Sequence, residues 1–287
     1  MEVLVVVANN VRLVPPCAYQ GGKNRIASSI VEYILATCEV NDKTIFFDLC
    51  SGSGAVSLEL VNHKIEPSKI TMCDISSWGK FYKSIGNETF SVEKFLEYAN
   101  SVPEDKNMIQ DFLKNLSLSD AEQDEEYKYI ILQSGSFGGK QIYREGNKWK
   151  NTSFRNYWQP TADSVRRSPV NPMQPSIKEI VKRVTNIYNL CKGIKCENFD
   201  IRNILDTIPK DNCIIYIDPP YKDTTKYGFN FDYEEFILSL KNKTKCPIFV
   251  SEGRIISEDY VEMYSNSQKS ICGKSKRENR EYLNRMQ

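Results

Sequence analysis

The feature that most constrains this chain is a stretch of eight residues that begins as a strand and ends in a rigid corner. The apolar run Ile214–Ile217 is typical of a strand buried inside a sheet. Asp218 follows it, and the proline after Asp218 restricts its backbone to extended conformations. Pro219 and Pro220 have no N–H group, so neither can continue the hydrogen bonding of a sheet. The stretch predicts a strand end that presents a carboxylate, backbone carbonyls and the ring of Tyr221.

This corner has the chemistry to bind an amino group on a flat base. Open α/β sheets bind their ligands outside the carboxyl ends of the strands. The carboxylate of Asp218 and a neighbouring carbonyl could accept both N–H bonds, while Tyr221 stacks on the ring. The alternative is an ordinary proline-rich turn with a surface tyrosine after a core strand. Four apolar residues followed directly by Asp-Pro-Pro-Tyr favour the ligand site.

A glycine-rich segment near the amino terminus suits a second part of a binding site. Tyr19-Gln20-Gly21-Gly22-Lys23 precedes apolar residues at helical spacing. The glycines allow a ligand to approach the backbone, and the N–H groups at a helix start attract a carboxylate. Lys23 adds a positive charge, and Tyr19 offers a ring for stacking. The alternative is a glycine turn with a solvated lysine.

A strand, a Gly-x-Gly loop and a helix follow, an order that forms nucleotide-binding crevices. The strand covers residues 44–49, and the loop contains Gly52 and Gly54. Ser57 stands where a dinucleotide fingerprint has its third glycine, which weakens the case for NAD. A second short strand ends at Asp74, 20 residues beyond Gly54, where an acid commonly binds ribose hydroxyls. The alternative for Asp74 is a residue that favours a turn after the strand.

Residues from about 86 to 175 interrupt this alternation of strands and helices. We expect helix over 90–118 and a solvated acidic face over 120–126. Residues 140–167 then carry a net charge of +5. Basic side chains neutralise phosphates and aromatic rings stack on bases, so the segment suits DNA. The interleaved aromatic residues are Phe137, Tyr143, Trp149, Phe154, Tyr157 and Trp158. The alternative is an ordinary solvated insertion.

The bulk composition excludes several classes of protein. The length of 287 residues suits one large α/β domain with an insertion, or two small domains. Nine scattered cysteines predict reduced thiols in a cytosol, without a legible zinc site. His63 is the only histidine, which argues against hydrolysis by a Ser-His-Asp or Cys-His site. We expect no signal peptide, and no apolar stretch approaches the roughly 20 residues that span a bilayer.

These elements resemble, in kind and in order, the Dam-like DNA adenine methyltransferases of phages and restriction systems. Residues 218–221 resemble the catalytic Asp-Pro-Pro-Tyr motif of the amino-methylating DNA methyltransferases. Residues 19–23 are similar to the family's aromatic-x-Gly-Gly-Lys element, which holds S-adenosylmethionine. Asp48, Gly52 and Gly54 resemble the first motif of enzymes that use this cofactor.

The resemblance implies an α/β fold: a Rossmann-like, mostly parallel sheet with an inserted target-recognition region. Residues 1–85 and 176–287 would form the catalytic domain, and 86–175 the DNA-binding insertion. The family often has Asp-aromatic-Arg near the cofactor's adenine, where this chain has Asp200 followed by Ile201. The implied cofactor-binding residues are Tyr19, Gly22, Lys23, Asp48, Gly52, Gly54, Asp74, Asp200 and Asp218. The implied catalytic residues are Asp218, Pro219, Pro220 and Tyr221. The expected DNA contacts are Lys140, Arg144, Lys148, Arg155, Arg166 and Arg167.

The resulting prediction is a site-specific methyltransferase that moves the methyl group of S-adenosylmethionine to N6 of a flipped-out adenine in double-stranded DNA. We expect no metal and no membrane, a location in the cytoplasm of a prokaryote or phage host, and a cognate restriction enzyme as a further partner. The alternatives are an amino-methyltransferase acting on cytosine N4, RNA adenine or protein glutamine, and a binding protein that has lost catalysis.

Overall fold

The computed structural model describes residues 11–105, 107–155, 175–220, 233–269 and 276–287, with backbone alone for 265–269 and 276–279. Its centre is a seven-stranded mixed sheet in the order β5-β2-β1-β6-β7-β9-β8. The first five strands are parallel, β9 is antiparallel to β7, and β8 is antiparallel to β9. The strands are β1 (Ile45–Leu49), β2 (Ile70–Cys73), β5 (Lys195–Glu197), β6 (Cys213–Ile217), β7 (Ile248–Glu252), β8 (Asp259–Lys269) and β9 (Lys276–Arg285).

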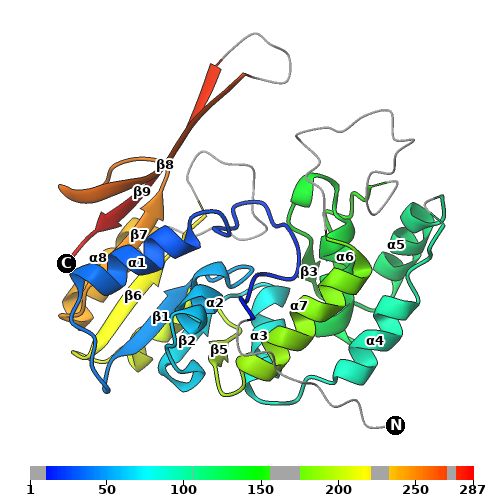
Figure 1. Cartoon of the computed structure of the whole chain (residues 1–287), viewed down its shortest axis with the longest axis horizontal. Helices are drawn as coiled ribbons and strands as arrows, with labels where there is room; N and C mark the ends of the chain where they lie inside the picture. Colours follow the sequence, from blue (N-terminus) through cyan, green and yellow to red (C-terminus); the bar gives the residue numbers. More distant parts are fainter. Residues whose placement is uncertain (1–10, 106, 156–174, 221–232, 270–275) are drawn as a thin grey trace.

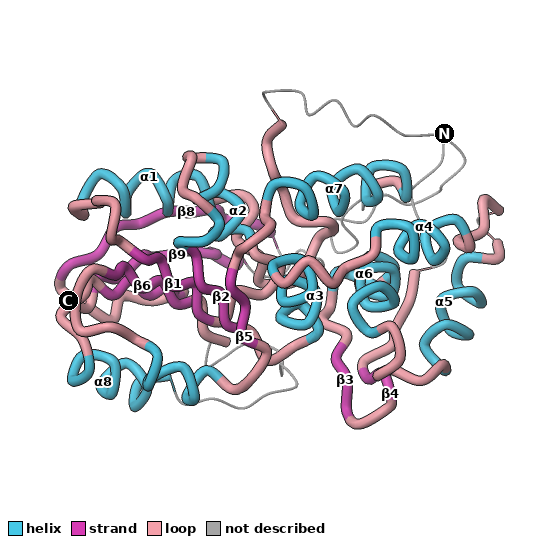
Figure 2. Tube along the Cα trace, turned by 90° about the horizontal axis from the view of Figure 1, so that it is seen from below, coloured by secondary structure: helices cyan, strands magenta, loops and turns pink. Residues whose placement is uncertain are grey.

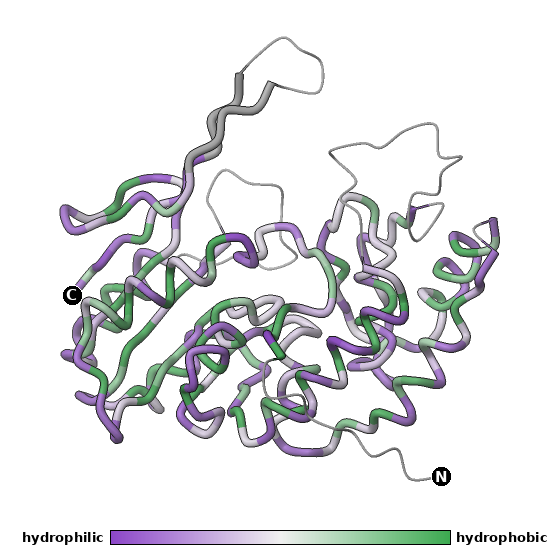
Figure 3. The backbone as a smooth tube through the Cα atoms, in the orientation of Figure 1, coloured by the Kyte–Doolittle hydropathy of each residue, from purple (hydrophilic) through white to green (hydrophobic). Residues whose placement is uncertain are grey.

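Helices cover both faces of the sheet, as Figure 2 shows. On one face lie α1 (Ala27–Thr37) and α2 (Ala55–Asn62), and on the other α8 (Tyr233–Lys243) and a 3-10 segment, η3 (Ile201–Thr207). Because successive side chains of a strand point to opposite faces, β6 contributes to two separate hydrophobic clusters. Ile214 and Tyr216 join the cluster that contains α1, whereas Ile215 and Ile217 join the cluster that contains α8. The central strands are correspondingly hydrophobic in Figure 3.

The expected insertion is a helical layer beside the sheet. It contains α4 (Val92–Asn100), α5 (Ile109–Leu118), α6 (Glu125–Gly135) and the small hairpin of β3 (Tyr143–Glu145) and β4 (Lys148–Lys150). Two further helices, α3 (Ser77–Gly86) and α7 (Ile177–Leu190), lie between this layer and the sheet.

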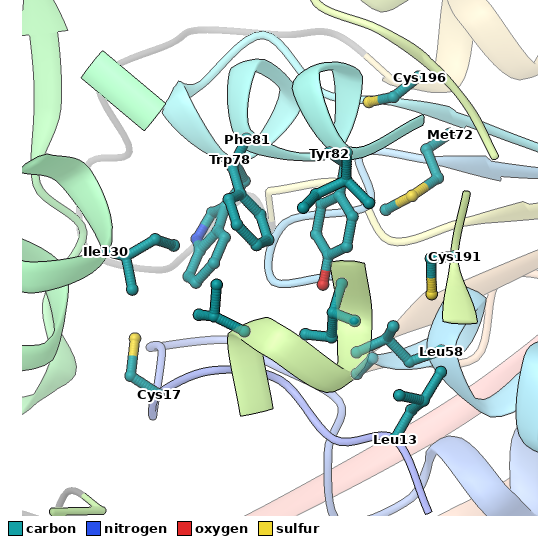
Figure 4. Packing of buried hydrophobic residues seen from close by; sticks show 14 of the residues in the cluster. Leu13, Cys17, Leu58, Met72, Trp78, Phe81, Tyr82, Ile130, Cys191 and Cys196 are labelled. Atoms are coloured by element: carbon teal, nitrogen blue, oxygen red, sulfur yellow. The ribbon is translucent and has the colours of Figure 1, made fainter. Parts of the chain in front are cut away.

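The insertion shares a core with the sheet. Trp78, Phe81 and Tyr82 of α3 point into a cluster that reaches from Leu58 of α2 to Ile130 of α6 (Figure 4). Trp78 also meets Tyr129 of α6 edge to face, with 5.2 Å between ring centroids.

Most strands and helices lie where the sequence predicted them, and three expectations were wrong. Residues 90–118 form two helices, α4 and α5, instead of one helical stretch. The acidic run is not a wholly solvated face, because Glu125 is 6% exposed and accepts a hydrogen bond from the Ser77 hydroxyl. Cys213 and Cys246 are joined by a disulfide, although six other described cysteines are free.

No helix in the described ranges is long and apolar enough to cross a membrane. Strand β9 forms a long hairpin with β8, which projects from the sheet in Figure 1.

Candidate active site

A cavity opens where the sequence predicted a site, at the carboxyl ends of β1, β2 and β6. Its volume is about 1050 Å³ including the open mouth. The wall combines the segment before α1, the loop after β1, and the ends of β2 and β6, together with Phe199–Ile201 and Gln141 of the insertion. The predicted residues that line it are Tyr19, Gly22, Lys23, Asp48, Gly52, Asp74, Asp200, Asp218, Pro219 and Pro220. Tyr221 lies outside the described residues.

The two predicted glycines of the loop have different structural tasks. Gly52 has a φ of +49°, and a Cβ there would lie 3.2 Å from the ring of Tyr19. Gly54 has a φ of +75°, and a Cβ there would lie 2.5 Å from the hydroxyl of Tyr82. The hydroxyl of Tyr82 donates to the carbonyl of Ser53 at 2.7 Å, so a hydrogen bond from α3 holds the loop. Gly54 does not line the cavity itself; it allows the loop to rest on Tyr82.

Asp74 holds the Gly-x-Gly loop against the end of β2. One oxygen of its carboxylate accepts the backbone N–H of Gly52 at 2.6 Å, and the other accepts both the N–H and the hydroxyl of Ser76. Burial raises the pKa of Asp74, and these hydrogen bonds to the charged form oppose the rise. The carboxylate therefore has a fixed orientation beside the loop.

Asp48 lies deeper than Asp74 and stabilises the start of α2. Its carboxylate accepts the backbone N–H of Ser57 at 3.1 Å and the Ser57 hydroxyl at 2.6 Å. The residue is 2% exposed, and burial raises its pKa to about 7. Asp48 contributes to the cavity wall mainly by fixing the loop and the helix that follows.

Asp218 and Lys23 form the central pair of the site. The Lys23 Nζ lies 2.6 Å from Oδ1 of Asp218 and donates to the Gly21 carbonyl at 3.2 Å. It is also 3.5 Å from Oε1 of Glu281, on β9. The sequence predicted a lysine directed at the cofactor, whereas the structure places its ammonium between two carboxylates. No sequence signal indicated Glu281, because it lies in a segment that resembles a charged tail.

Burial raises the pKa of Asp218 to about 7, and the Lys23 ammonium opposes the rise. The carboxylates of Glu281 and Glu252 act in the same direction as burial. The backbone N–H of Asp218 donates to the carbonyl of Leu49 at 3.1 Å, which continues the β1–β6 pairing up to the first proline. The strand thus ends with a fixed carboxylate at the cavity.

Asp200 lies at the edge of the cavity rather than deep inside it. Its side chain is 31% exposed and accepts from Nε of Arg202 at 2.8 Å, and this arginine lowers the pKa of the carboxyl. The family's aromatic residue is replaced by Ile201, but Phe199 also lines the cavity. The aromatic surface therefore comes from the residue before the acid instead of the residue after it.

A family model shows which family the chain belongs to. The model for the D12 class of N6 adenine-specific DNA methyltransferases matches residues 19–250. The match begins at Tyr19 and includes the glycine loop, the insertion and Asp218. The chain belongs to this family. No curated protein matches it.

Membership in the D12 family confirms the predicted fold, cofactor and activity. The chain is a DNA adenine-N6 methyltransferase that uses S-adenosylmethionine, and its mixed sheet is the Rossmann-like sheet of such enzymes. The alternatives of cytosine, RNA or protein targets, and of a relative without catalysis, are thereby set aside.

The cavity of this D12 methyltransferase fits a cationic cofactor. Asp48, Asp74, Asp200 and Asp218 line it, opposed by the single ammonium of Lys23. Such an excess of carboxylates favours a ligand with sulfonium and ammonium charges. The Ser51 hydroxyl lies in the same wall, and its oxygen is buried without a hydrogen-bond partner in the described structure. Among the described residues, no group of three or more histidines, cysteines or acids could hold a metal ion.

The DNA contacts expected in the insertion fall into four groups. Lys140 and Lys148 are exposed. Arg144 pairs with Glu122 at 2.9 Å and with Glu125 at 3.0 Å. Arg155 is 2% exposed and donates to the carbonyl of Ser136, so it stabilises the insertion and does not lie at a surface. Arg166, Arg167, Tyr157 and Trp158 lie outside the described residues.

Two aromatic residues expected to meet DNA are instead part of the insertion's core. Trp149 is 5% exposed and Phe154 is 6% exposed. Trp149 stacks on Tyr129 of α6, with 6.1 Å between ring centroids. The expectation that the Trp149 ring stacks on a base was wrong, since composition alone does not show which rings of a basic segment are buried.

Proposed function

We propose that the cavity beside β6 holds S-adenosylmethionine, and that Asp218 and the carbonyl of Pro219 hold the target amino group next to it. The observation that carries this proposal is the half-buried carboxylate of Asp218 at the end of a parallel strand, where it lies 2.6 Å from the Lys23 ammonium. Bound there, the cofactor supplies a methyl group on a positively charged sulfur.

Asp218 acts on the amino group in two ways. Its carboxylate accepts one N–H bond of the adenine amino group, which directs the nitrogen lone pair at the methyl group. When the nitrogen forms its bond to carbon, it must lose a proton, and the free oxygen of Asp218 can accept it. A carboxyl with a pKa near 7 suits this transfer at neutral pH. Positioning supplies most of the rate in such an in-line displacement.

The other residues of the cavity orient the two reactants. Asp74 and the glycine loop would hold the ribose and amino-acid parts of the cofactor, and Tyr19 would cover it. Asp200 and Phe199 would lie beside its adenine. Tyr221 would stack on the flipped target base, as the family resemblance implies. Support for these roles comes from the shared cavity wall and from the orientation of Asp74.

We further propose that residues 86–175 contact double-stranded DNA through Lys140, Lys148 and the arginines at 166 and 167. Residues 1–85 and 176–287 would then be the catalytic domain. Arg144 could contribute only by leaving its two acidic partners, and Arg155 is not part of this surface. From the family we also propose a cytoplasmic location in a prokaryote or phage host and a cognate restriction enzyme as a partner.

Calorimetry with S-adenosylmethionine tests the location of the cofactor site. Asp74→Ala and Lys23→Ala should each weaken binding by roughly 1–3 kcal/mol, because each removes a charged partner from the cavity. Glu145→Ala is the matched control, since it removes an acid from the exposed hairpin of the insertion. Unchanged affinity in both cavity variants would show that the cofactor binds elsewhere.

A further inference from the structure

The long hairpin of β8 and β9 places one acid at the active edge of the sheet. Strand β9 runs antiparallel to β7, and its last pairs with β7 join Leu283 to Ser251 and Tyr282 to Glu252. Glu281 comes one residue beyond these pairs. Because Glu252 ends β7 at the carboxyl edge of the sheet, Glu281 lies at the edge that carries Asp218.

The same strand also sets the direction of the Glu281 side chain. Leu283 belongs to the hydrophobic cluster that contains α1, and side chains two residues apart on a strand share a face. Glu281 therefore points toward the segment that precedes α1, where Lys23 lies. Its Oε1 is 3.5 Å from the Lys23 Nζ, and its side chain is 15% exposed.

Lys23 thus contacts two carboxylates that come from distant parts of the chain. The Nζ is 2.6 Å from Asp218 and 3.5 Å from Glu281, and the lysine side chain is 8% exposed. Charge pairs shielded from water interact more strongly than exposed ones. The Glu281 carboxylate competes with Asp218 for the Lys23 ammonium and also repels the negative charge on Asp218.

We propose that Glu281 is a positioning residue of methyl transfer, which holds the Lys23 ammonium between two carboxylates and so sets the orientation and the electrostatic environment of Asp218. This inference rests on the role of Asp218 under Proposed function. It extends the active site to the base of the projecting hairpin, which lies beyond the residues matched by the family model.

Several other groups act on the charge of Asp218, and the inference includes them. Glu252 of β7 raises the pKa of Asp218 together with Glu281, and Lys23 lowers it. The further groups that interact with Asp218 are Asp48 of β1, Cys50 after β1 and Tyr216 of β6. Replacing Glu281 removes its own effect on the pKa of Asp218 and leaves the effects of the other groups in place.

The test is the pH dependence of single-turnover methyl transfer to genomic DNA that lacks methylated adenine. The rate should rise with pH as Asp218 becomes ionised. In Glu281→Gln, the midpoint of this rise should move to lower pH by about one unit, because a nearby like charge is removed. Glu262→Gln is the matched control, since it removes an exposed acid from the same hairpin. Its midpoint should equal that of the wild type.

A second variant and a binding measurement separate this role from a structural one. Glu281→Asp keeps the charge, so its midpoint should stay near that of the wild type, even if its rate falls. A purely structural role would lower the rate of Glu281→Gln equally at every pH and leave the midpoint unchanged; that result would overturn the inference. If Asp218→Ala also retained its turnover, the proposed function itself would fail. If Asp218→Ala were inactive and the midpoint of Glu281→Gln equalled that of the wild type, only the role of Glu281 would be contradicted.

Discussion

Asp218 belongs to a recognisable sequence motif and has an unusual electrostatic environment in the structure. The prolines end the strand, the strand pairing fixes the backbone, and burial raises the pKa of the carboxyl to about 7. The Lys23 ammonium, 2.6 Å from Asp218, opposes that rise in pKa. A carboxylate in this environment can accept a hydrogen bond from a substrate amino group and then its proton.

The first prediction concerns the removal of this carboxylate. Asp218→Ala should reduce methyl transfer at least about a hundredfold, as expected when a positioned polar group is lost from an active site. The fold should survive, because the strand ends at Ile217 and the prolines remain. Labelled methyl incorporation into DNA measures the effect, and circular dichroism checks the fold. Turnover within twofold of the wild type would contradict the assignment.

The second prediction concerns the buried acid Asp48. Its pKa in the folded protein is about 7, well above the usual value for an aspartate. Between about pH 4 and pH 7 the folded state therefore binds more protons than the unfolded state, and this residue makes the protein less stable as pH rises. Asp48→Asn removes that titration. The melting temperature of the variant minus that of the wild type should increase by at least about 2 °C between pH 5 and pH 8. A difference that is constant across these pH values would contradict the raised pKa.

Sequence reasoning found the residues that belong to local motifs and missed the one that depends on tertiary packing. Asp218, Asp74 and the glycines have short-range patterns that point to a role. Glu281 has none, since its contact with Lys23 is formed only when β9 pairs with β7. For the same reason the orientation of Lys23 toward Asp218 was not foreseen.

At the scale of elements, the loop between β1 and α2 depends on Gly54. Its φ of +75° is unfavourable for other residues, and a Cβ would meet the Tyr82 hydroxyl at 2.5 Å. Gly146 in the β3–β4 hairpin has a φ of +58° but no atom within 4 Å of the same position. The two glycines share a backbone conformation and differ in their surroundings.

The third prediction compares alanine at these two glycines. Gly146→Ala should cost about 1 kcal/mol, the price of a left-handed conformation alone. Gly54→Ala should cost roughly 1–3 kcal/mol more, because Tyr82 must also move. It should weaken S-adenosylmethionine binding as well, since the loop lies against the cavity. Urea unfolding and calorimetry provide both values, and equal losses of stability would show that the loop does not rest on Tyr82.

The elements themselves were predictable to different degrees. Strands β1, β6 and β7 are short apolar runs bounded by turn residues, so their sequence pattern was sufficient to predict them. Helix α6 was missed because its first turn is acidic and its remaining residues are buried on all sides, which removes the usual polar face. The β8–β9 hairpin was missed because its charged, polar sequence lacks the alternation of a half-buried strand.

At the scale of the whole molecule, the insertion proposed to contact DNA lies beside the cavity and contributes Gln141 to its wall. Its helices share a core with the sheet, so the two functions lie in one continuous structure. Residues 140–167 carry a net charge of +5, which would attract phosphates under this proposal, although the chain as a whole carries only +1.

The fourth prediction follows from that charge. DNA affinity should fall steeply with salt, because bound lysines and arginines release counterions from DNA. Replacing Arg166 and Arg167 together by glutamine should flatten the salt slope by up to about two units, one for each phosphate contact. Arg155→Gln, in contrast, should reduce stability, since this arginine is buried. Fluorescence titrations over a range of salt measure the slope. An unchanged slope in the double variant would place the DNA surface elsewhere, with the β9 segment as the next region to test.

The most direct test of the central claim is the analysis of nucleosides from host DNA. The wild-type protein and the Asp218→Ala variant are expressed at equal levels in a host without adenine methylation, and the digested DNA is analysed by mass spectrometry. We predict N6-methyladenine with the wild type and its loss with Asp218→Ala. Methylated cytosine in place of adenine, or equal amounts of N6-methyladenine from both proteins, would contradict the account.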